Sequence, residues 1–133
     1  MDGVREEPPT DVDVLARQLI GAAIEVHRAL GPGYLETTYE EALCVELRLR
    51  GTTFERQKPF RVVYKGFSVT EGRIDILVAD ILVVELKAVE TLLPIHTAQA
   101  LAYLKATGLH LALVINFNVS VLKNGIRRIV LSQ

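Results

Sequence analysis

The sequence lacks most of the features that mark specialised classes of protein. It has one cysteine in 133 residues, Cys44, which excludes an internal disulfide and a four-cysteine iron–sulfur cluster. It has no apolar run of the roughly 18–20 residues that a membrane span needs, so we expect no contact with a membrane. Its first residues do not resemble a secretory signal peptide. These absences together predict a protein of the reducing cytoplasm.

Strong charge of one sign and the common phosphate-binding motifs are also missing. The net charge is −1, so any attraction to nucleic acid must come from a local basic patch. Lys123, Arg127 and Arg128 form one candidate patch, although a solvated strand end is the more usual explanation. There is no glycine-rich phosphate loop and no nucleophile elbow. The three histidines lack the spacing of zinc ligands, and His27 is predicted to be a packed helix residue.

What the chain does have is enough apolar sequence for one hydrophobic core. Half of its residues are hydrophobic, and its length leaves no room for a second domain. Residues 1–9 are polar and contain Pro8 and Pro9, so they are predicted to be a disordered tail. Residues 10–133 are predicted to form a single domain.

Apolar periodicity and turn residues predict a mixture of helices and strands. Helices are expected over 10–30, 34–50 and 94–107, the last between Pro94 and Gly108. The third helix is apolar nearly all round, which predicts that it packs across a sheet, with His96, Gln99 and Tyr103 as its polar stripe. Strands are expected over 52–57, 60–64, 67–69, 73–78, 82–88, 109–116 and 126–131, with a turn at Lys65-Gly66.

Three charged residues interrupt the two most apolar strands. Asp75 lies within 73–78, and Glu85 and Lys87 lie two residues apart within 82–88, so a strand points both to one face. An ionised carboxylate is costly to bury without a partner. Two carboxylates that hold a divalent cation, with an ammonium beside them, would explain the pattern. A structural ion-pair cluster is the alternative.

The apolar pattern also predicts how these two strands pair. A three-residue connection, 79–81, would place Asp75 opposite Glu85 and build one apolar face. The predicted pairs are Val78 with Leu82, Ile76 with Val84, and Ile74 with Leu86.

Three motifs carry a resemblance to a known family. Asp75 followed by Glu85-Leu-Lys87 resembles the PD-(D/E)XK nuclease superfamily. The segment Gln99-Ala-Leu-Ala-Tyr103 is similar to the Gln-x-x-x-Tyr element of its exonuclease branch. The segment from Gly33 to Tyr39, with Glu36 between them, resembles the signature of the small bacterial GxxExxY proteins of that superfamily. The resemblance implies an α/β, restriction-endonuclease-like fold, a mixed central sheet flanked by helices with an αβββαβ core.

The resemblance also implies roles for particular residues. Asp75, Glu85, the backbone carbonyl of Leu86 and, directly or through water, Glu36 would bind Mg²⁺ or Mn²⁺. Lys87 would position or deprotonate a water or steady the phosphate, and Gln99 and Tyr103 would assist. Glu36 is alternatively a carboxylate favoured by the helix dipole. Glu25 is the rival third carboxylate, and Arg73 would contact a phosphate or form a surface ion pair.

The function expected from this resemblance is metal-dependent hydrolysis of phosphodiester bonds in DNA or RNA, with DNA the more expected partner. A nucleic-acid-binding or protein-interaction module that does not cut is the alternative. A symmetric homodimer is expected as well, because so small a chain offers little surface to hold a duplex.

Overall fold

The computed structural model describes residues 10–131. The predicted tail, 1–9, therefore lies outside the described residues, as do residues 132 and 133. No helix of the described range is long and apolar enough to cross a membrane. The elements are α1 (Thr10–Leu30), α2 (Glu36–Leu49), β1 (Phe54–Tyr64), β2 (Phe67–Val78), β3 (Leu82–Lys87), α3 (Pro94–Thr107), β4 (Leu111–Asn116), the short 3₁₀ helix η1 (Leu122–Gly125) and β5 (Ile126–Val130).

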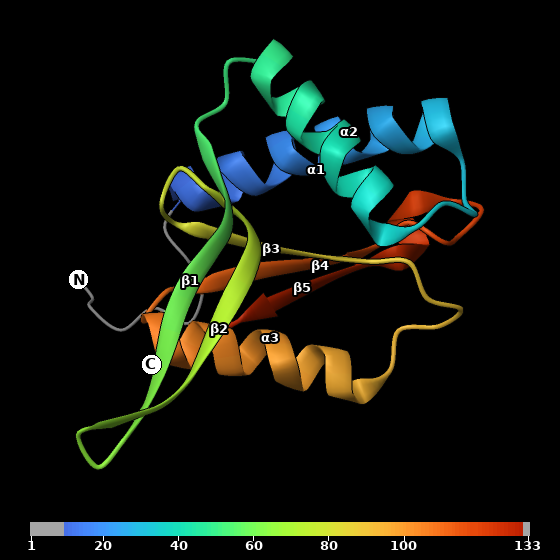
Figure 1. The fold of residues 1–133 in the computed structure, drawn as a ribbon. Coiled ribbons are helices and arrows are strands. Elements are labelled where there is room, and N and C mark those ends of the chain that lie inside the picture. Colours follow the sequence, from blue (N-terminus) through green and yellow to red (C-terminus); the bar gives the residue numbers. More distant parts are fainter. Residues whose placement is uncertain (1–9, 132–133) are drawn as a thin grey trace.

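The strands form one mixed sheet in the order β1-β2-β3-β4-β5. The central pair, β3 and β4, is parallel, and every other neighbouring pair is antiparallel. Helices α1 and α2 cover one face of the sheet and α3 covers the other (Figure 1). The fold predicted from the sequence, a mixed sheet flanked by helices, is confirmed.

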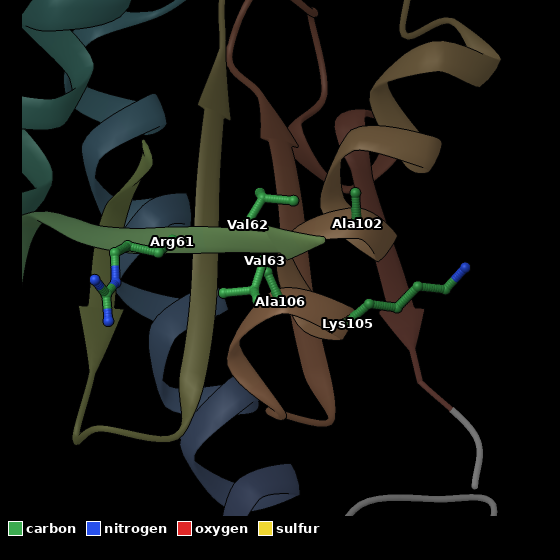
Figure 2. Close-up of a pocket in the computed structure, with 6 residues that line it drawn as sticks. All are labelled: Arg61, Val62, Val63, Ala102, Lys105 and Ala106. Atoms are coloured by element: carbon green, nitrogen blue, oxygen red, sulfur yellow. The ribbon is translucent and has the colours of Figure 1, made fainter. Parts of the chain in front are cut away.

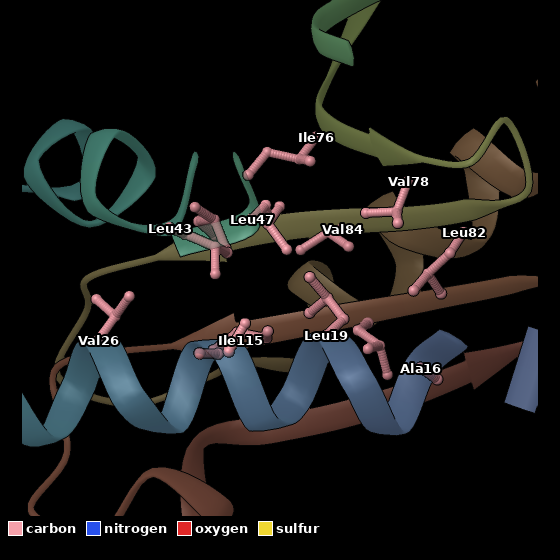
Figure 3. Packing of buried hydrophobic residues seen from close by; sticks show 14 of the residues in the cluster. Ala16, Leu19, Val26, Leu43, Leu47, Ile76, Val78, Leu82, Val84 and Ile115 are labelled. Carbon is pink, nitrogen blue, oxygen red and sulfur yellow. The ribbon is translucent and has the colours of Figure 1, made fainter. Parts of the chain in front are cut away.

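The two faces of the sheet carry two separate hydrophobic clusters. Alternate residues of β3 divide between them: Val84 and Leu86 pack beneath α1 and α2, and Val83 packs beneath α3. In Figure 3, Leu19 of α1 and Leu43 of α2 point toward the strand residues of the first cluster. Because β3 is buried on both faces, any charged side chain on it is withdrawn from water.

Helix α3 packs on the sheet as predicted, but only one of its faces is buried. Ala100 and Leu104 are fully buried, whereas Ile95 is 55% exposed. Ala102 and Ala106 are exposed as well. The helix forms an outer layer with no element over it in the described chain. Its apolar composition therefore leaves exposed apolar surface rather than a helix buried on all sides.

Four predicted strands turn out to be two, which corrects the sequence-based prediction. The segments 52–57 and 60–64 belong to β1, and the segments 67–69 and 73–78 belong to β2. Pro59 lies between the two predicted segments, but β1 continues through it because β1 is an edge strand, where a missing N–H is tolerated. Gly72 continues β2 because it lies opposite Phe60, whose ring occupies the space of a side chain.

The predicted register of β2 and β3 is correct at one end and wrong at the other. The ladder contains the pairs Val78–Leu82 and Ile76–Val84, but Ile74 does not pair with Leu86. Ile74 packs in the α3 cluster, while Ile76 and Leu86 pack beneath α1 and α2. Residues two apart on a regular strand share a face, so the alternation is interrupted at Asp75.

Candidate functional site

Asp75 and Glu85 lie where the ladder between β2 and β3 ends, and each carboxylate binds the backbone of the other strand. Oδ2 of Asp75 accepts the N–H of Leu86 at 2.8 Å, and Oε2 of Glu85 accepts the N–H of Asp75 at 2.9 Å. The side chains thus replace the regular backbone pairs that the register would otherwise continue. This reciprocal arrangement holds two carboxylates side by side.

Burial and mutual repulsion make these carboxylates hard to ionise together. Glu85 is only 6% exposed, and burial, followed by the charge of Asp75, raises its pKa to about 8. The pKa of Asp75 is also raised, mainly by burial, and the charge of Glu40 adds to the effect. The N–H of Leu86 and the ammonium of Lys87 act in the opposite direction. An additional positive charge at this point would therefore be strongly stabilised.

Lys87 and Glu36 belong to the same electrostatic group. The ammonium of Lys87 favours the charged forms of Glu36, Asp75 and Glu85. The pKa of Glu36 is raised, first by burial and then by the charge of Asp75. The structure thus brings together four of the predicted site residues from three elements, α2, β2 and β3.

Gly33 and Tyr39, in the segment that resembles the GxxExxY signature, shape the connection between α1 and α2. Gly33 has φ of 111°, a conformation that favours glycine. Tyr39 is fully buried, stacks on Phe117 with ring centroids 4.5 Å apart, and donates its hydroxyl hydrogen to the carbonyl of Gly31 at 2.6 Å. Tyr39 therefore fixes the α1–α2 connection. With the start of α2 fixed in this way, Glu36 lies close enough to Asp75 for the charge of Asp75 to contribute, after burial, to its raised pKa.

A network beside Asp75 contains residues that the sequence analysis missed. Glu40 is buried and accepts hydrogen bonds from Arg56, at 2.9 Å, and from Gln57, at 3.0 Å. Gln57 lies opposite Asp75 in the β1–β2 register, has φ of 50°, and donates a hydrogen bond that favours the Asp75 carboxylate. One signal was present in the sequence: Glu40 lies one helical turn after Glu36, on the same face.

The polar stripe predicted on α3 divides into one residue at the site and two elsewhere. The ring of Tyr103 packs against that of Phe60 at a tilt of 56°, and burial, followed by the charges of Glu85 and Asp75, raises the pKa of Tyr103. Gln99 is exposed, and no side-chain hydrogen bond joins it to the described residues. His96 accepts the N–H of Leu93 at 3.0 Å and so caps the helix. The role predicted for Gln99 stays a prediction.

The remaining candidates lie elsewhere or are occupied by other contacts. Glu25 is exposed in a groove between α1 and α2 and is absent from the surroundings of Asp75 and Glu85. His27 is buried, as predicted, and its Nε2 lies 2.7 Å from the carbonyl oxygen of Val119. Arg127 donates to the carbonyl of Leu92, and Arg128 pairs with Asp13 at 2.7 Å, as expected of a strand end.

The donor set suits a hard divalent cation of the Mg²⁺ type. Within residues 10–131, no three His, Cys, Asp or Glu side chains are grouped closely enough to hold a metal ion. Mg²⁺, however, is commonly bound by one or two carboxylates together with waters. Oε1 of Glu85 accepts no hydrogen bond from the described residues, so it is available to a cation. Asp75 and Glu85 therefore fit such an ion, and Glu36 as a further ligand stays a prediction.

Comparison with known families agrees with this geometry. A family model described as the PD-(D/E)XK nuclease superfamily matches residues 13–129. The chain belongs to the PD-(D/E)XK nuclease superfamily. No curated protein and no solved structure gives a significant match. Membership supports a nuclease-like fold and, at the level of the superfamily, divalent metal use and binding of nucleic acid.

Proposed function

We propose that this chain is a divalent-metal-dependent nuclease of the GxxExxY branch that hydrolyses phosphodiester bonds in DNA or RNA. The observation that carries the proposal is the reciprocal pair formed by Asp75 and Glu85. A buried carboxylate, Glu85, and a half-buried one, Asp75, are held together by backbone N–H groups, with the ammonium of Lys87 beside them. Buried carboxylates with raised pKa values beside a cationic group are typical of catalytic sites.

The ligands of this proposed centre are Asp75, Glu85, the carbonyl oxygen of Leu86 and Glu36, and the ion is Mg²⁺ or Mn²⁺. When bound, such an ion would polarise a phosphodiester and lower the pKa of a bound water. Its positive charge would also ionise both carboxylates at neutral pH, since it offsets the burial and, second, the repulsion from Asp75 that raise the pKa of Glu85.

The chain itself supplies the groups that orient the substrate. The ammonium of Lys87 stands beside the carboxylates, where it would hold the attacking water or a phosphate oxygen. Tyr103 has a raised pKa, so its hydroxyl keeps its proton at neutral pH and can donate to a phosphate oxygen. Gln99, one turn earlier on α3, would join Tyr103 once a substrate is bound.

A cleavage assay tests the proposal. Single-stranded and duplex DNA and RNA are incubated with the wild type in Mg²⁺ or Mn²⁺, and with EDTA as the blank. We expect cleavage that requires the metal. Lys87→Ala should lower the rate by about 10²–10⁴-fold, the usual worth of a positioned acid–base group. Arg17→Ala, which removes an exposed positive charge from α1, is the matched control and should cleave like the wild type.

The same assay separates the alternative function. The absence of a three-carboxylate group within residues 10–131 favours a module that binds without cutting. Metal binding by the wild type without cleavage of any substrate would establish that alternative. Equal cleavage by Lys87→Ala and Arg17→Ala would refute the proposed role of Lys87.

A further inference from the structure

The outer half of the β1–β2 hairpin carries exposed aromatic side chains. In Figure 1 this half extends away from the helices as an arm, which we define as residues 60–73. Tyr64 is 62% exposed and Phe67 is 75% exposed, with Val63 and Val69 exposed beside them. Contiguous exposed apolar surface on a soluble protein marks a place where something binds.

Tyr64 and Phe67 are arranged as a pair. They are directly opposite each other in the ladder, on either side of the turn at Lys65-Gly66. Side chains directly opposite in an antiparallel pair lie on the same face, so the two rings share one side of the arm. The ammonium of Lys65 lies 5.4 Å from the centre of the Tyr64 ring. The tip thus combines two flat rings and a positive charge.

The arm is basic although the whole chain is not. Residues 60–73 contain Arg61, Lys65 and Arg73 against one acid, Glu71, a net charge of +2, whereas the chain as a whole carries −1. Arg61 and Lys65 form no salt bridge with the described residues. The molecule thus places, on this arm, the local basic patch that its overall charge does not provide.

A groove continues this basic surface onto helix α3. It has a volume of about 410 Å³ and is lined by Arg61, Val62 and Val63 of β1 and by Ala102, Lys105 and Ala106 of α3. Figure 2 shows the two valines beside the small alanine side chains, with Lys105 extending outward. Its floor is apolar, and Arg61 and Lys105 supply positive charge at its edges.

We propose that the arm and this groove bind a single-stranded segment of nucleic acid, with bases stacked on Tyr64 and Phe67 and phosphates paired with Arg61, Lys65 and Lys105. This inference rests on the proposed function, for which it names the form of the substrate. Aromatic rings interleaved with basic residues are how proteins hold single strands, because every base offers a flat face. In a duplex those faces are already stacked and only the phosphates remain accessible.

A second copy of the chain fits this surface less well. In a two-fold dimer the same patch would meet itself, so Arg61 and Lys65 would face their own counterparts. The open edge of β1 also carries Pro59 and charged residues such as Lys58, which hinder pairing with another strand. A polyanion would be attracted by Arg61 and Lys65, and it would not need to pair with the edge of β1.

The length of the arm sets the distance between the bound nucleic acid and the proposed metal site. Phe67 and Asp75 are separated by eight residues of one strand, or about 26 Å at the usual rise per residue. A single-stranded nucleic acid held at the tip of the arm would therefore be cut several nucleotides away from the bases stacked on Tyr64 and Phe67. The arm contains none of the proposed metal ligands, so binding and cleavage can be tested separately.

The test measures binding by fluorescence anisotropy in EDTA, where cleavage cannot occur. Labelled single-stranded and duplex oligonucleotides are titrated with the wild type and with the double variant Tyr64→Ser/Phe67→Ser. We expect the wild type to prefer the single strand. Each lost ring should weaken single-strand binding by about 5- to 150-fold, the usual worth of one stacked base. Leu49→Ser, on the exposed side of α2, is the matched control and should bind like the wild type.

Salt dependence tests the charged half of the inference. Arg61→Ala and Lys105→Ala should each reduce the slope of the logarithm of the binding constant against the logarithm of salt concentration by about 0.7, the value for one single-strand phosphate contact. Unchanged binding by the tip variant, or equal affinity of the wild type for duplex, would overturn the inference. So would a wild-type dimer that the tip substitutions convert to a monomer in light scattering.

Failure of the single-strand inference can be told apart from failure of the nuclease proposal. Loss of single-strand binding in the tip variant, with no cleavage by the wild type, would support the inference while the nuclease proposal fails. Cleavage by the wild type with unchanged binding in the tip variant would do the reverse. A wild type that binds no oligonucleotide in EDTA and cleaves none with Mg²⁺ or Mn²⁺ would overturn both.

Discussion

The inner and outer halves of the β1–β2 hairpin differ although they belong to the same two strands. The inner half lies between α2 and α3, and there Asp75 lies beside Glu85 of β3, with burial raising the pKa of both carboxyl groups. The outer half meets α3 only along the groove at Arg61, Val62 and Val63, and at its tip Tyr64 and Phe67 are exposed. The packing of helices against the hairpin, more than the sequence of its strands, thus decides which half raises the pKa of its carboxyl groups and which half exposes aromatic rings that can bind a ligand.

The largest expected difference between the two halves is in how they affect the pH dependence of the free energy of unfolding without metal. The pKa of Glu85 is about 8 in the folded protein against an ordinary value of 4.5. Between these values the folded state keeps a proton that the unfolded state loses. The free energy of unfolding should therefore fall as pH rises, by up to about 1.4 kcal/mol per unit. Below about 4.5 both states are protonated, and above about 8 both are ionised, so the effect is confined to this window.

Matched acid-to-amide substitutions isolate that effect from the rest of the molecule. Between about pH 5.5 and about pH 8.5, Glu85→Gln should remove about 3 kcal/mol of the wild-type decrease, as measured by urea unfolding in EDTA. Glu71→Gln, on the exposed arm, should leave the decrease unchanged. If both variants follow the wild-type pH profile, the Glu85 carboxyl is not the buried, hard-to-ionise group described here.

A smaller loss of stability is expected when a methyl group is added at Gly72, where the arm joins the inner half of the hairpin. A methyl group at Gly72 would clash with the ring of Phe60, which itself packs on Tyr103. Gly72→Ala should lower the free energy of unfolding by about 1–3 kcal/mol, the usual cost of overpacking. Ser68→Ala, on the exposed part of the arm, should change it by less than about 0.5 kcal/mol. Equal values in urea unfolding would mean that the base of the arm, at Gly72, is no more tightly packed than its exposed part.

Much of the fold could be predicted from the sequence because its signals are local. The helices and the buried strands β3 and β4 follow from apolar periodicity and from the residues that end them. Strand continuity was harder, because Pro59 and Gly72 normally interrupt strands. Here one lies on an open edge and the other makes room for a ring from the neighbouring strand. Neither circumstance can be inferred from adjacent residues.

The site divides in the same way between local and distant signals. Asp75, Glu85 and Lys87 were found because charge inside an apolar strand is unusual in itself. Glu40 and Gln57 were missed because their importance arises only when α2 and β1 meet beside Asp75. The interrupted alternation at Asp75 was missed for a similar reason. Its carboxylate binds the backbone of the next strand, which strict alternation does not anticipate.

Thermal unfolding with and without Mn²⁺ tests most directly whether Asp75 and Glu85 hold a metal. In the wild type at about pH 8, a concentration of Mn²⁺ about 100 times the dissociation constant should stabilise the fold by about 2.7 kcal/mol and raise Tm by several degrees. Glu85→Gln loses one ligand charge, so its Tm should not rise. Equal increases in both proteins, or none in either, would contradict a metal centre at Asp75 and Glu85 and leave these residues as a structural ion-pair cluster.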